Sequence, residues 1–407
     1  MNDVGSGPFI LTINGGSSSL KCSLYHVGPP LACIASVLVD RVGFPEGILT
    51  LTDVAGGTSE RRPIQAAHHK DCVDPLIAWL KQKIAITDLV GIGHRVVHGG
   101  RRYDEPQWIT PDVTDELKRL SPYDPEHLPA EIELIEAFNQ RFPLVPQVAC
   151  FDTAFHSVMP RVSRLLPIPR RYDKMGVQRY GFHGLSCAYV IRELQRIGLP
   201  SEANGRVIIA HLGNGASLTA VHKGRSIDTT MSFTPAAGLP MSRRSGDVDP
   251  GLVSYLARTE GMTAEQFHTM ANTESGLLGM SETSSDMRDL LACEARDVRA
   301  AEAVAMFCYH VKKGIGAFGA ALGGLDTLVF TGGIGENSVV VRSRICEGLD
   351  YLGVVVDDAC NRAGEPIVSV PGTEATVRVM HTDEESEIAR SVYQLIHGSH
   401  VTKATRD

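Results

Sequence analysis

Two segments almost half the chain apart repeat one pattern, and this repetition limits the possible folds more than any other feature. Residues 9–25 contain two short β-rich runs around a Gly/Ser turn, and residues 206–230 contain two similar runs around a second glycine turn. An offset of 198 aligns Ile10 with Ile208, Gly15 with Gly213, Ser19 with Ser217 and Leu20 with Leu218. A period this long excludes a solenoid, so we expect two related α/β domains.

Helical and strand patterns alternate along the rest of the chain. Apolar spacing and capping residues predict helices near 129–142, 185–197, 251–260, 299–322 and 384–397, and β-rich runs predict strands near 34–39 and 325–330. This alternation favours mixed or parallel sheets flanked by helices. We expect the boundary just after Phe151-Asp152, which gives an N-terminal domain at 1–153 and a C-terminal domain at 154–383.

Charge and cysteine usage argue against several classes of function. The 407 residues carry a formal net charge of -8 without a basic stripe, so we expect no nucleic-acid partner. No apolar run is long enough to cross a bilayer and residues 1–8 lack a secretory pattern, so we expect no membrane partner. Nine scattered cysteines form no C-x-x-C pair, which predicts reduced thiols in the cytoplasm.

The first glycine turn, Asn14 to Lys21, combines backbone amides, hydroxyls and one lysine. Such a turn suits phosphate binding, and a tight hairpin turn is an equal alternative. It is not a P-loop, because Leu20 stands where that motif needs a glycine before the lysine. The second turn, His211 to Gly215, occupies the corresponding place in the second hairpin.

A third glycine-rich segment, Gly332 to Ser338, follows a predicted strand and leads toward a helix. Free amides at such a point can bind an anion or a nucleotide, and a plain strand-to-helix turn is the alternative. The third glycine of the dinucleotide fingerprint is missing, so a dehydrogenase is poorly supported.

Arginines occur in two segments that could meet negative charge. His94 and His98 flank the first segment, but the β-branched pair between them indicates the end of a strand rather than a helical metal site. Arg95 there offers a guanidinium to a carboxylate or phosphate, or forms a surface ion pair. Arg243 and Arg244 could clamp an anion, unless the aspartates that follow neutralise them.

Three helix starts allow both a functional and a plain interpretation. His183 precedes a predicted helix, where it could donate to an anion or simply pack or cap. Asp286 fits an ordinary N-cap. Thr382 together with Glu385 fits a capping box, which the spacing alone favours.

In their order and residues, these segments together resemble the acetate kinase family. These are short-chain carboxylate kinases of the superfamily that contains acetate and sugar kinases, Hsp70 and actin. The resemblance runs from residue 9 to about residue 397. Besides the Asn14 turn, its most specific segments are HRVVHGG at 94–100, FDTAFH at 151–156, YGFHG at 180–184, HLGNGAS at 211–217, RSGD at 244–247, SSDMRD at 284–289 and GGIGENS at 332–338. It implies two ribonuclease-H-like domains facing a cleft, with a helix at 384–400 packed on the first domain. It also implies reversible phosphorylation of acetate by Mg-ATP, giving acetyl phosphate and ADP.

The resemblance further implies a role for each matching position. Four catalytic residues are implied: Arg95, Asp152, His183 and Arg244. The carboxylate pocket would consist of Arg95, Val97, Phe182 and Pro235. Nucleotide-binding positions would be Lys21, His211, Leu212, Gly213, Asn214, Gly215, Asp286, Met287, Arg288, Gly333, Ile334, Gly335, Glu336 and Asn337. Asn14 and Glu384 match the magnesium site, where Mn²⁺ is a possible substitute, and Ser17 and Ser19 match the phosphate loop.

One stretch, residues 121–129, departs from the family pattern. His127 matches a family histidine, which puts Glu126 where a leucine is usual. Either the loop is locally shifted, or one wall of the pocket is polar. The choice between acetate and propionate, a phosphoryl donor other than ATP, and the physiological direction stay open. The family also implies a homodimer that binds only small molecules besides its own copy.

Two rival functions remain open at this point. A non-catalytic, ATP-gated module of the actin or Hsp70 type would close on the nucleotide without needing a carboxylate clamp, so Arg95 and Arg244 would be incidental. A sugar kinase would need an aspartate base beside a polar sugar pocket, which fits poorly with two arginines.

Overall fold

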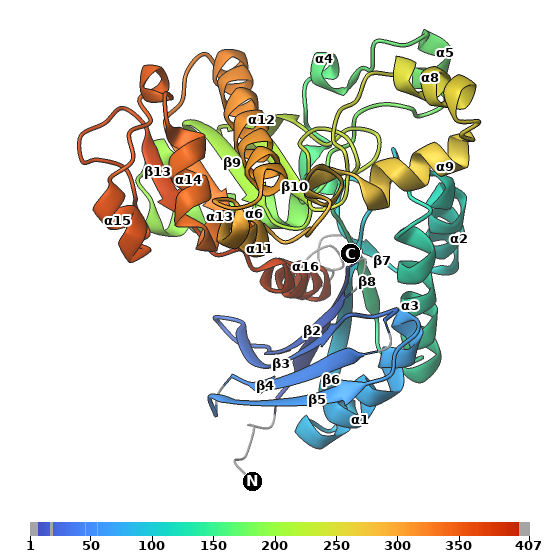
Figure 1. The fold of residues 1–407 in the computed structure, drawn as a ribbon. Coiled ribbons are helices and arrows are strands. Elements are labelled where there is room, and N and C mark those ends of the chain that lie inside the picture. Colours follow the sequence, from blue (N-terminus) through green and yellow to red (C-terminus); the bar gives the residue numbers. More distant parts are fainter. Residues whose placement is uncertain (1–6, 17–18, 45, 55, 399–407) are drawn as a thin grey trace. The chain divides into compact units, whose positions relative to one another are not determined.

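The computed structural model describes residues 7–16, 19–44, 46–54 and 56–398 (Figure 1). Its described residues form two compact units, one from residues within 1–154 and 383–407 and the other from 155–382. The predicted phosphate-loop position Ser17 and the last two positions of the helix predicted at 384–400 lie outside the described residues. Among the described helices, none combines the length and the apolar character that crossing a membrane requires.

The first unit is built on a mixed sheet in the order β5-β4-β3-β2-β1-β6-β8-β7. β1 pairs antiparallel with β2 and parallel with β6, and β6 pairs parallel with β8. The predicted hairpin at 9–25 and the predicted strand near 34–39 are confirmed. The strands are β1 (Phe9–Gly15), β2 (Ser19–His26), β3 (Ala32–Asp40), β4 (Gly47–Asp53), β5 (Thr58–Ile64), β6 (Leu89–Val96), β7 (Gln107–Trp108) and β8 (Gln147–Phe151).

The second unit repeats the central part of this sheet, in the order β11-β10-β9-β12-β13. Here β9 pairs antiparallel with β10 and parallel with β12, which pairs parallel with β13. Both units therefore share one arrangement, in which three antiparallel strands are followed by two parallel ones, as the repeated hairpin predicts. The strands are β9 (Arg206–Leu212), β10 (Ala216–His222), β11 (Arg225–Thr229), β12 (Thr327–Thr331) and β13 (Thr376–Val379).

The constant offset of 198 does not extend through both strands of the hairpin. Ile10 pairs with Tyr25, whereas Ile208 pairs with Ala220 rather than with Lys223, which a constant offset would require. The two turns cause the difference, because different numbers of residues separate the paired strands. A residue-by-residue match of small side chains misses such a shift in register, since hairpin pairing depends on the length of the turn.

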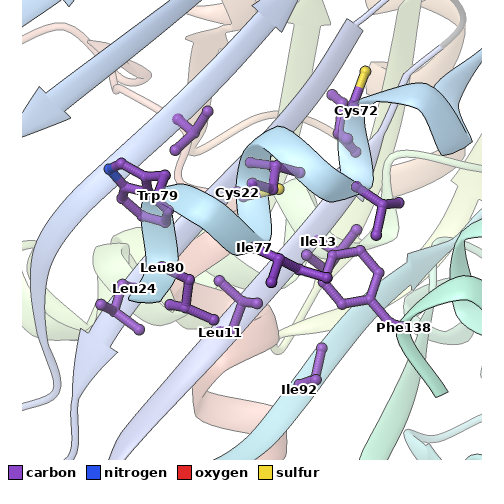
Figure 2. Packing of buried hydrophobic residues seen from close by; sticks show 14 of the residues in the cluster. Leu11, Ile13, Cys22, Leu24, Cys72, Ile77, Trp79, Leu80, Ile92 and Phe138 are labelled. Atoms are coloured by element: carbon purple, nitrogen blue, oxygen red, sulfur yellow. The ribbon is translucent and has the colours of Figure 1, made fainter. Parts of the chain in front are cut away.

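Helices cover both faces of the first sheet. Ile92 on β6 packs in one apolar cluster with Phe138 of α3 (Leu128–Arg141) and with α1 (Val73–Lys83) (Figure 2). Its neighbours Gly91 and Gly93 face the other side, where α16 (Glu384–Gly398) lies so close that a Cβ on Gly93 would be 2.4 Å from Ile388. Alternate residues of a strand face opposite sides of a sheet. The two glycines therefore let the last helix approach the backbone of β6.

The second sheet is layered in the same way. α6 (Gly184–Ile197) packs its buried face on Val207 and Ile209 of β9. α12 (Val298–Leu322) covers the opposite face, where its Gly314 lies against Leu218 of β10. The helices predicted at 129–142, 185–197, 251–260, 299–322 and 384–397 and the strand at 325–330 are all confirmed, with ends shifted by a few residues at most.

Candidate active site

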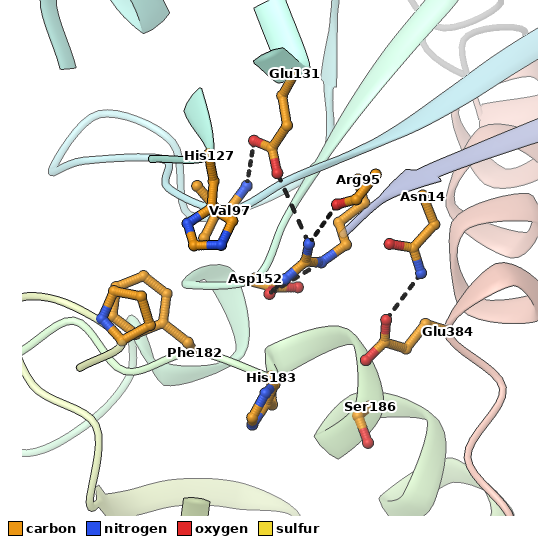
Figure 3. A network of polar contacts seen from close by, with 12 residues as sticks. Asn14, Arg95, Val97, His127, Glu131, Asp152, Phe182, His183, Ser186 and Glu384 are labelled. Atoms are coloured by element: carbon orange, nitrogen blue, oxygen red, sulfur yellow. Dashed lines mark hydrogen bonds and ion pairs between the residues drawn. The ribbon is translucent and has the colours of Figure 1, made fainter. Parts of the chain in front are cut away.

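The carboxyl ends of two neighbouring parallel strands bring Arg95 and Asp152 together in the first unit. Arg95 lies on β6 opposite Cys150 of β8, and Asp152 directly follows β8. The Arg95 side chain donates from Nε and Nη2 to Asp152 Oδ2 at 3.1 and 2.5 Å, and from Nη1 to the carbonyl oxygen of Gly15 at 2.9 Å (Figure 3). The interpretation of Arg95 as a surface ion pair is wrong, because Asp152 is fully buried.

The environment keeps Arg95 charged. Burial lowers its pKa, but the attraction of Asp152, Glu384 and Glu131 outweighs that effect and leaves the pKa above its ordinary value. Asp152 Oδ1 is buried too, and within the described residues it has no hydrogen-bond partner. This unit therefore holds a fixed guanidinium beside a carboxylate oxygen that is free to accept.

Glu131 on α3 is a member of this network that the sequence did not indicate. Its Oε2 accepts a hydrogen bond from the backbone N–H of Val97 at 2.9 Å, and its Oε1 lies 3.7 Å from Arg95 Nη1. Burial raises the pKa of Glu131 to about 7, although Arg95 and the Val97 hydrogen bond act to lower it. An acidic residue in an amphipathic helix carries no sequence signal of burial, because only packing decides which face is covered.

Asn14 lies beside two carboxylates at the start of the last helix. Its side-chain amide donates to Glu384 and to Glu385 at 3.0 Å each (Figure 3). Lys21 follows the turn on β2 and is opposite Asn14 in the hairpin. Thus the first glycine turn, two carboxylates and a lysine lie close together, although 370 residues separate Asn14 from Glu384.

Polar side chains of the divergent stretch 121–129 contact one another and line a small cavity. His127 Nδ1 lies 2.8 Å from Asp124 Oδ1, and Asp124 is buried. A small cavity of about 20 Å³ has both charged and apolar lining, from Gly15, Gly16, His69, Glu126, His127, Ala130, Glu131 and Leu134. Polar side chains therefore line this cavity, and both alternatives for the stretch stay predictions.

His183 begins α6 in the second unit and has a left-handed backbone, with φ at 57°. Its Nδ1 lies 2.9 Å from the hydroxyl of buried Ser217, and its ring stacks on His211 at 4.0 Å between centroids. Ser186, one turn into the helix (Figure 3), lies 2.8 Å from His211 Nδ1. The two imidazoles are therefore each oriented by a serine hydroxyl.

Arg244 approaches the second glycine turn, His211 to Gly215. A Cβ on Gly215 would lie 3.1 Å from His183 Nε2 and 3.6 Å from Arg244 Nη2, so the bare backbone of Gly215 is what lets both side chains come close. Arg244 Nη1 also donates to the carbonyl oxygen of Pro235 at 2.8 Å. The side chain of Phe182 is buried, and its carbonyl oxygen lies 2.8 Å from Nε2 of buried His156.

The third glycine segment forms a short helix of its own, α13 (Gly332–Asn337), directly after β12. Gly332 has φ at 76°, and a Cβ there would lie 2.8 Å from the Leu212 carbonyl oxygen. Glu336 accepts from the Gly332 N–H at 2.9 Å, and Asn337 donates to the Gly333 carbonyl oxygen at 2.9 Å. Ile334 lies within the same short helix. Buried Arg342 donates to the Gly335 carbonyl oxygen at 2.9 Å.

The second and third turns lie side by side. A Cβ on Gly213 would be 3.7 Å from the backbone nitrogen of Gly333. Parallel pairing of β9 with β12 explains this, because their carboxyl ends meet at one edge of the sheet. Asn214 in the same turn accepts from the Ser242 hydroxyl at 3.3 Å.

Two of the helix-start predictions have different outcomes. Asp286 caps α11 (Met287–Cys293) by accepting from the Arg288 N–H at 2.8 Å, and it also pairs with the exposed Arg288 side chain. The predicted capping box of Thr382 with Glu385 is wrong. Asp383 instead accepts from the Ser386 N–H at 2.8 Å, and Thr382 donates to the Ser186 hydroxyl. The two candidate caps are adjacent, so spacing alone could not separate them.

Both sheets share the order and direction of five strands, and both carry glycine turns at strand ends, so the chain has a duplicated α/β fold of the ribonuclease-H-like class. Comparison with known proteins gives the family. The model of the acetokinase family matches residues 9–390. The chain belongs to the acetokinase family, which makes it an enzyme and removes the non-catalytic alternative.

Individual relatives agree with this assignment. The acetate kinase of Bacillus subtilis (strain 168) is 42% identical over 394 residues, which is 95% of this chain and 99% of that protein. The crystal structure of Porphyromonas gingivalis acetate kinase matches 96% of this chain and 100% of its own, with a TM-score of 0.86 and 36% identity. A propionate kinase from Francisella tularensis subsp. tularensis SCHU S4 matches 95% and 99%, with a TM-score of 0.88 and 35% identity.

Proposed function

We propose that this chain transfers the γ-phosphoryl group of ATP to acetate, reversibly and in line, giving acetyl phosphate and ADP. The observation that carries the proposal is the Arg95 side chain held by buried Asp152 beside the Asn14 turn, in a chain that matches acetate kinases along its length. A carboxylate oxygen of acetate attacks the γ-phosphorus, the new P–O bond forms, and the bond to the ADP oxygen breaks. Such a transfer needs mainly positioning and charge neutralisation.

The first unit would supply the acceptor side. Arg95 binds the acetate carboxylate, and Val97 contributes an apolar wall. Asp152 fixes the guanidinium, because it takes two of its donors. A fixed planar fork loses less freedom on binding a carboxylate than a mobile side chain would.

The second unit would supply the transferring group. The Ser217 hydroxyl can donate to His183 Nδ1, and in that tautomer Nε2 carries the proton, which it would donate to a phosphoryl oxygen. Arg244 would neutralise the charge that spreads over the equatorial oxygens, and Phe182 and Pro235 would supply the apolar contacts of this unit with the substrate. The turns at His211–Gly215 and Gly333–Asn337, with Asp286, Met287 and Arg288, bind the nucleotide.

Magnesium dependence belongs to the same proposal. No group of three or more His, Cys, Asp or Glu side chains in the described part of the chain could hold a metal ion by itself. Mg²⁺ is commonly held by one or two carboxylates together with substrate phosphates, so Asn14 and Glu384 fit it as oxygen ligands. When bound, Mg²⁺ or Mn²⁺ supplies positive charge to the phosphate oxygens of the nucleotide.

Trapping the product tests the proposal. Purified protein with Mg-ATP and acetate should yield acyl hydroxamate when hydroxylamine is added, with ADP formed in equal amount. Propionate and butyrate compete in parallel reactions, because the polar side chains near Glu126 leave the preferred chain length open. Chelating the metal should abolish product, and adding Mg²⁺ or Mn²⁺ back should restore it. A protein that yields hydroxamate from none of the three acids would contradict the proposed function.

We also infer a homodimer and a cytoplasmic location. α8 (Gly251–Thr259) has no buried residue, and it exposes Leu252, Val253 and Tyr255 by 39%, 40% and 55%. Clustered exposed apolar side chains favour association with a partner surface. Light scattering at micromolar concentration should give twice the mass of one chain, and Val253→Glu should lower it. A wild-type mass equal to one chain would exclude the dimer.

All nine cysteines are free thiols, which supports a reducing compartment.

A further inference from the structure

We propose that Glu131 is a positioning residue that orients Val97 and Arg95 and sets how much positive charge Arg95 offers to the acceptor carboxylate. This inference rests on the proposed function, because it concerns the same acceptor site. Glu131 touches neither the reacting atoms nor the nucleotide in that scheme. It acts through the two residues that would bind acetate.

The first argument is the hydrogen bond to the backbone. Glu131 Oε2 accepts from the Val97 N–H at 2.9 Å, at the point where β6 ends. Val97 therefore has no strand partner for this N–H, and a buried unsatisfied N–H is costly. A side chain from α3 satisfies it and fixes the chain at the residue expected to face the acetate methyl group.

The second argument is the balance of charge around Arg95. Its Nε and Nη2 donate to Asp152, and its Nη1 donates to Gly15 while lying 3.7 Å from Glu131 Oε1. Glu131 Oε1 is buried and has no hydrogen bond from any described residue. If Glu131 is ionised, it and Asp152 place two negative charges beside the single positive charge of Arg95. Acetate would have to bind as a further negative charge, and like charges in a buried site repel strongly.

The protonation state of Glu131 therefore matters for binding. The groups around it are Arg95 on β6, and Asp124 and His127 from the segment before α3, with His69 and Glu126 lining the same cavity and Asp152 and Glu384 acting through Arg95. Burial raises the pKa of Glu131 to about 7. Below that pH the neutral acid leaves the charge of Arg95 available. Above it, the ionised group competes with acetate, so acetate binding weakens as pH rises.

The test compares the pH dependence of KM in three proteins. Wild type, Glu131→Gln and Glu133→Gln are assayed for hydroxamate with saturating Mg-ATP and varied acetate between pH 6 and pH 8. Glu133 is the matched control, because it is an exposed glutamate on the same helix. In wild type and Glu133→Gln the KM for acetate should rise about fivefold over this range, since one pKa unit of coupling gives its full tenfold effect on binding only well above both pKa values. In Glu131→Gln, whose amide oxygen can still accept from Val97, KM should change less than twofold and stay near the wild-type value at pH 6.

The outcomes separate this inference from the proposed function. Protonation of ATP affects all three proteins equally, so only the difference between them bears on Glu131. A parallel rise of KM in Glu131→Gln and wild type would overturn the inference while leaving acetate kinase activity intact. Loss of kcat in Glu131→Gln with KM unchanged would also overturn it, because that result indicates general damage to the site. Equal melting temperatures of Glu131→Gln and Glu133→Gln would show that the variants are folded. Glu131→Asp keeps a carboxyl group at this position, so its KM for acetate should still rise with pH.

Discussion

Replacing Arg244 by alanine should lower kcat roughly a thousandfold, because arginines that neutralise a transferring phosphoryl group commonly contribute that much or more. Arg244 lies against the Gly215 backbone beside His183, and its Nη1 donates a hydrogen bond to the Pro235 carbonyl oxygen. The side chain is only partly buried, so its removal should leave the melting temperature almost unchanged. The measurement is steady-state hydroxamate formation together with thermal unfolding.

The neighbouring arginine provides the control for this variant. Arg243 is exposed, so Arg243→Ala removes the same charge one position away and should keep turnover within about twofold of wild type. Arg244→Ala with near-normal kcat would remove this residue from the mechanism. Equal losses in the two variants would instead mean that only the overall positive charge of the loop matters.

Replacing Arg95 by methionine should abolish activity and also destabilise the protein. Asp152 is fully buried and Glu131 nearly so, and the substitution leaves both without their cation. Removing one partner of a buried ion pair typically lowers the free energy of unfolding by about 3–5 kcal/mol. Denaturant unfolding measures that loss, and the hydroxamate assay measures the activity.

A double variant distinguishes the two effects. Arg95→Met combined with Asp152→Leu removes both charges of the pair, so part of the lost stability should return, because apolar groups can replace a buried pair at little net cost while Glu131 still lacks its cation. Activity should stay absent, since neither the clamp nor its anchor is present. Recovery of turnover in the double variant would show that Arg95 serves stability and takes no part in the reaction.

Much of the fold is predictable from local sequence patterns. The repeated hairpin, the helices at 129–142, 185–197, 299–322 and 384–397 and the strand before Gly332 follow from apolar periodicity and capping residues, which act over a few neighbouring positions. The register of the second hairpin was not predictable from an offset, because the two turns differ in length. The N-cap is Asp383 rather than Thr382, because the Thr382 hydroxyl makes a tertiary hydrogen bond to Ser186 instead.

The candidate site divides in a similar way. Arg95, Asp152, His183 and Arg244 stand out in the sequence because their motifs match a family, but the contacts that orient them do not. Ser217 and Ser186 orient imidazoles from a neighbouring strand and helix, and Glu131 reaches Val97 from a helix more than thirty positions away. Nothing in the sequence marks these contacts, because helical and strand positions acquire them only through packing.

The sequence by itself thus determined the class of fold, the three glycine turns, the order of the motifs and the family. Those features are local, or are shared along the whole length with relatives. Only the tertiary structure decided that Asp152 fixes Arg95, that Glu384 and Glu385 contact Asn14, and that Glu126 and His127 line a small cavity. The physical reason is that parallel strands and a returning last helix bring distant residues to one sheet edge. Burial there determines which charges pair and which pKa values shift.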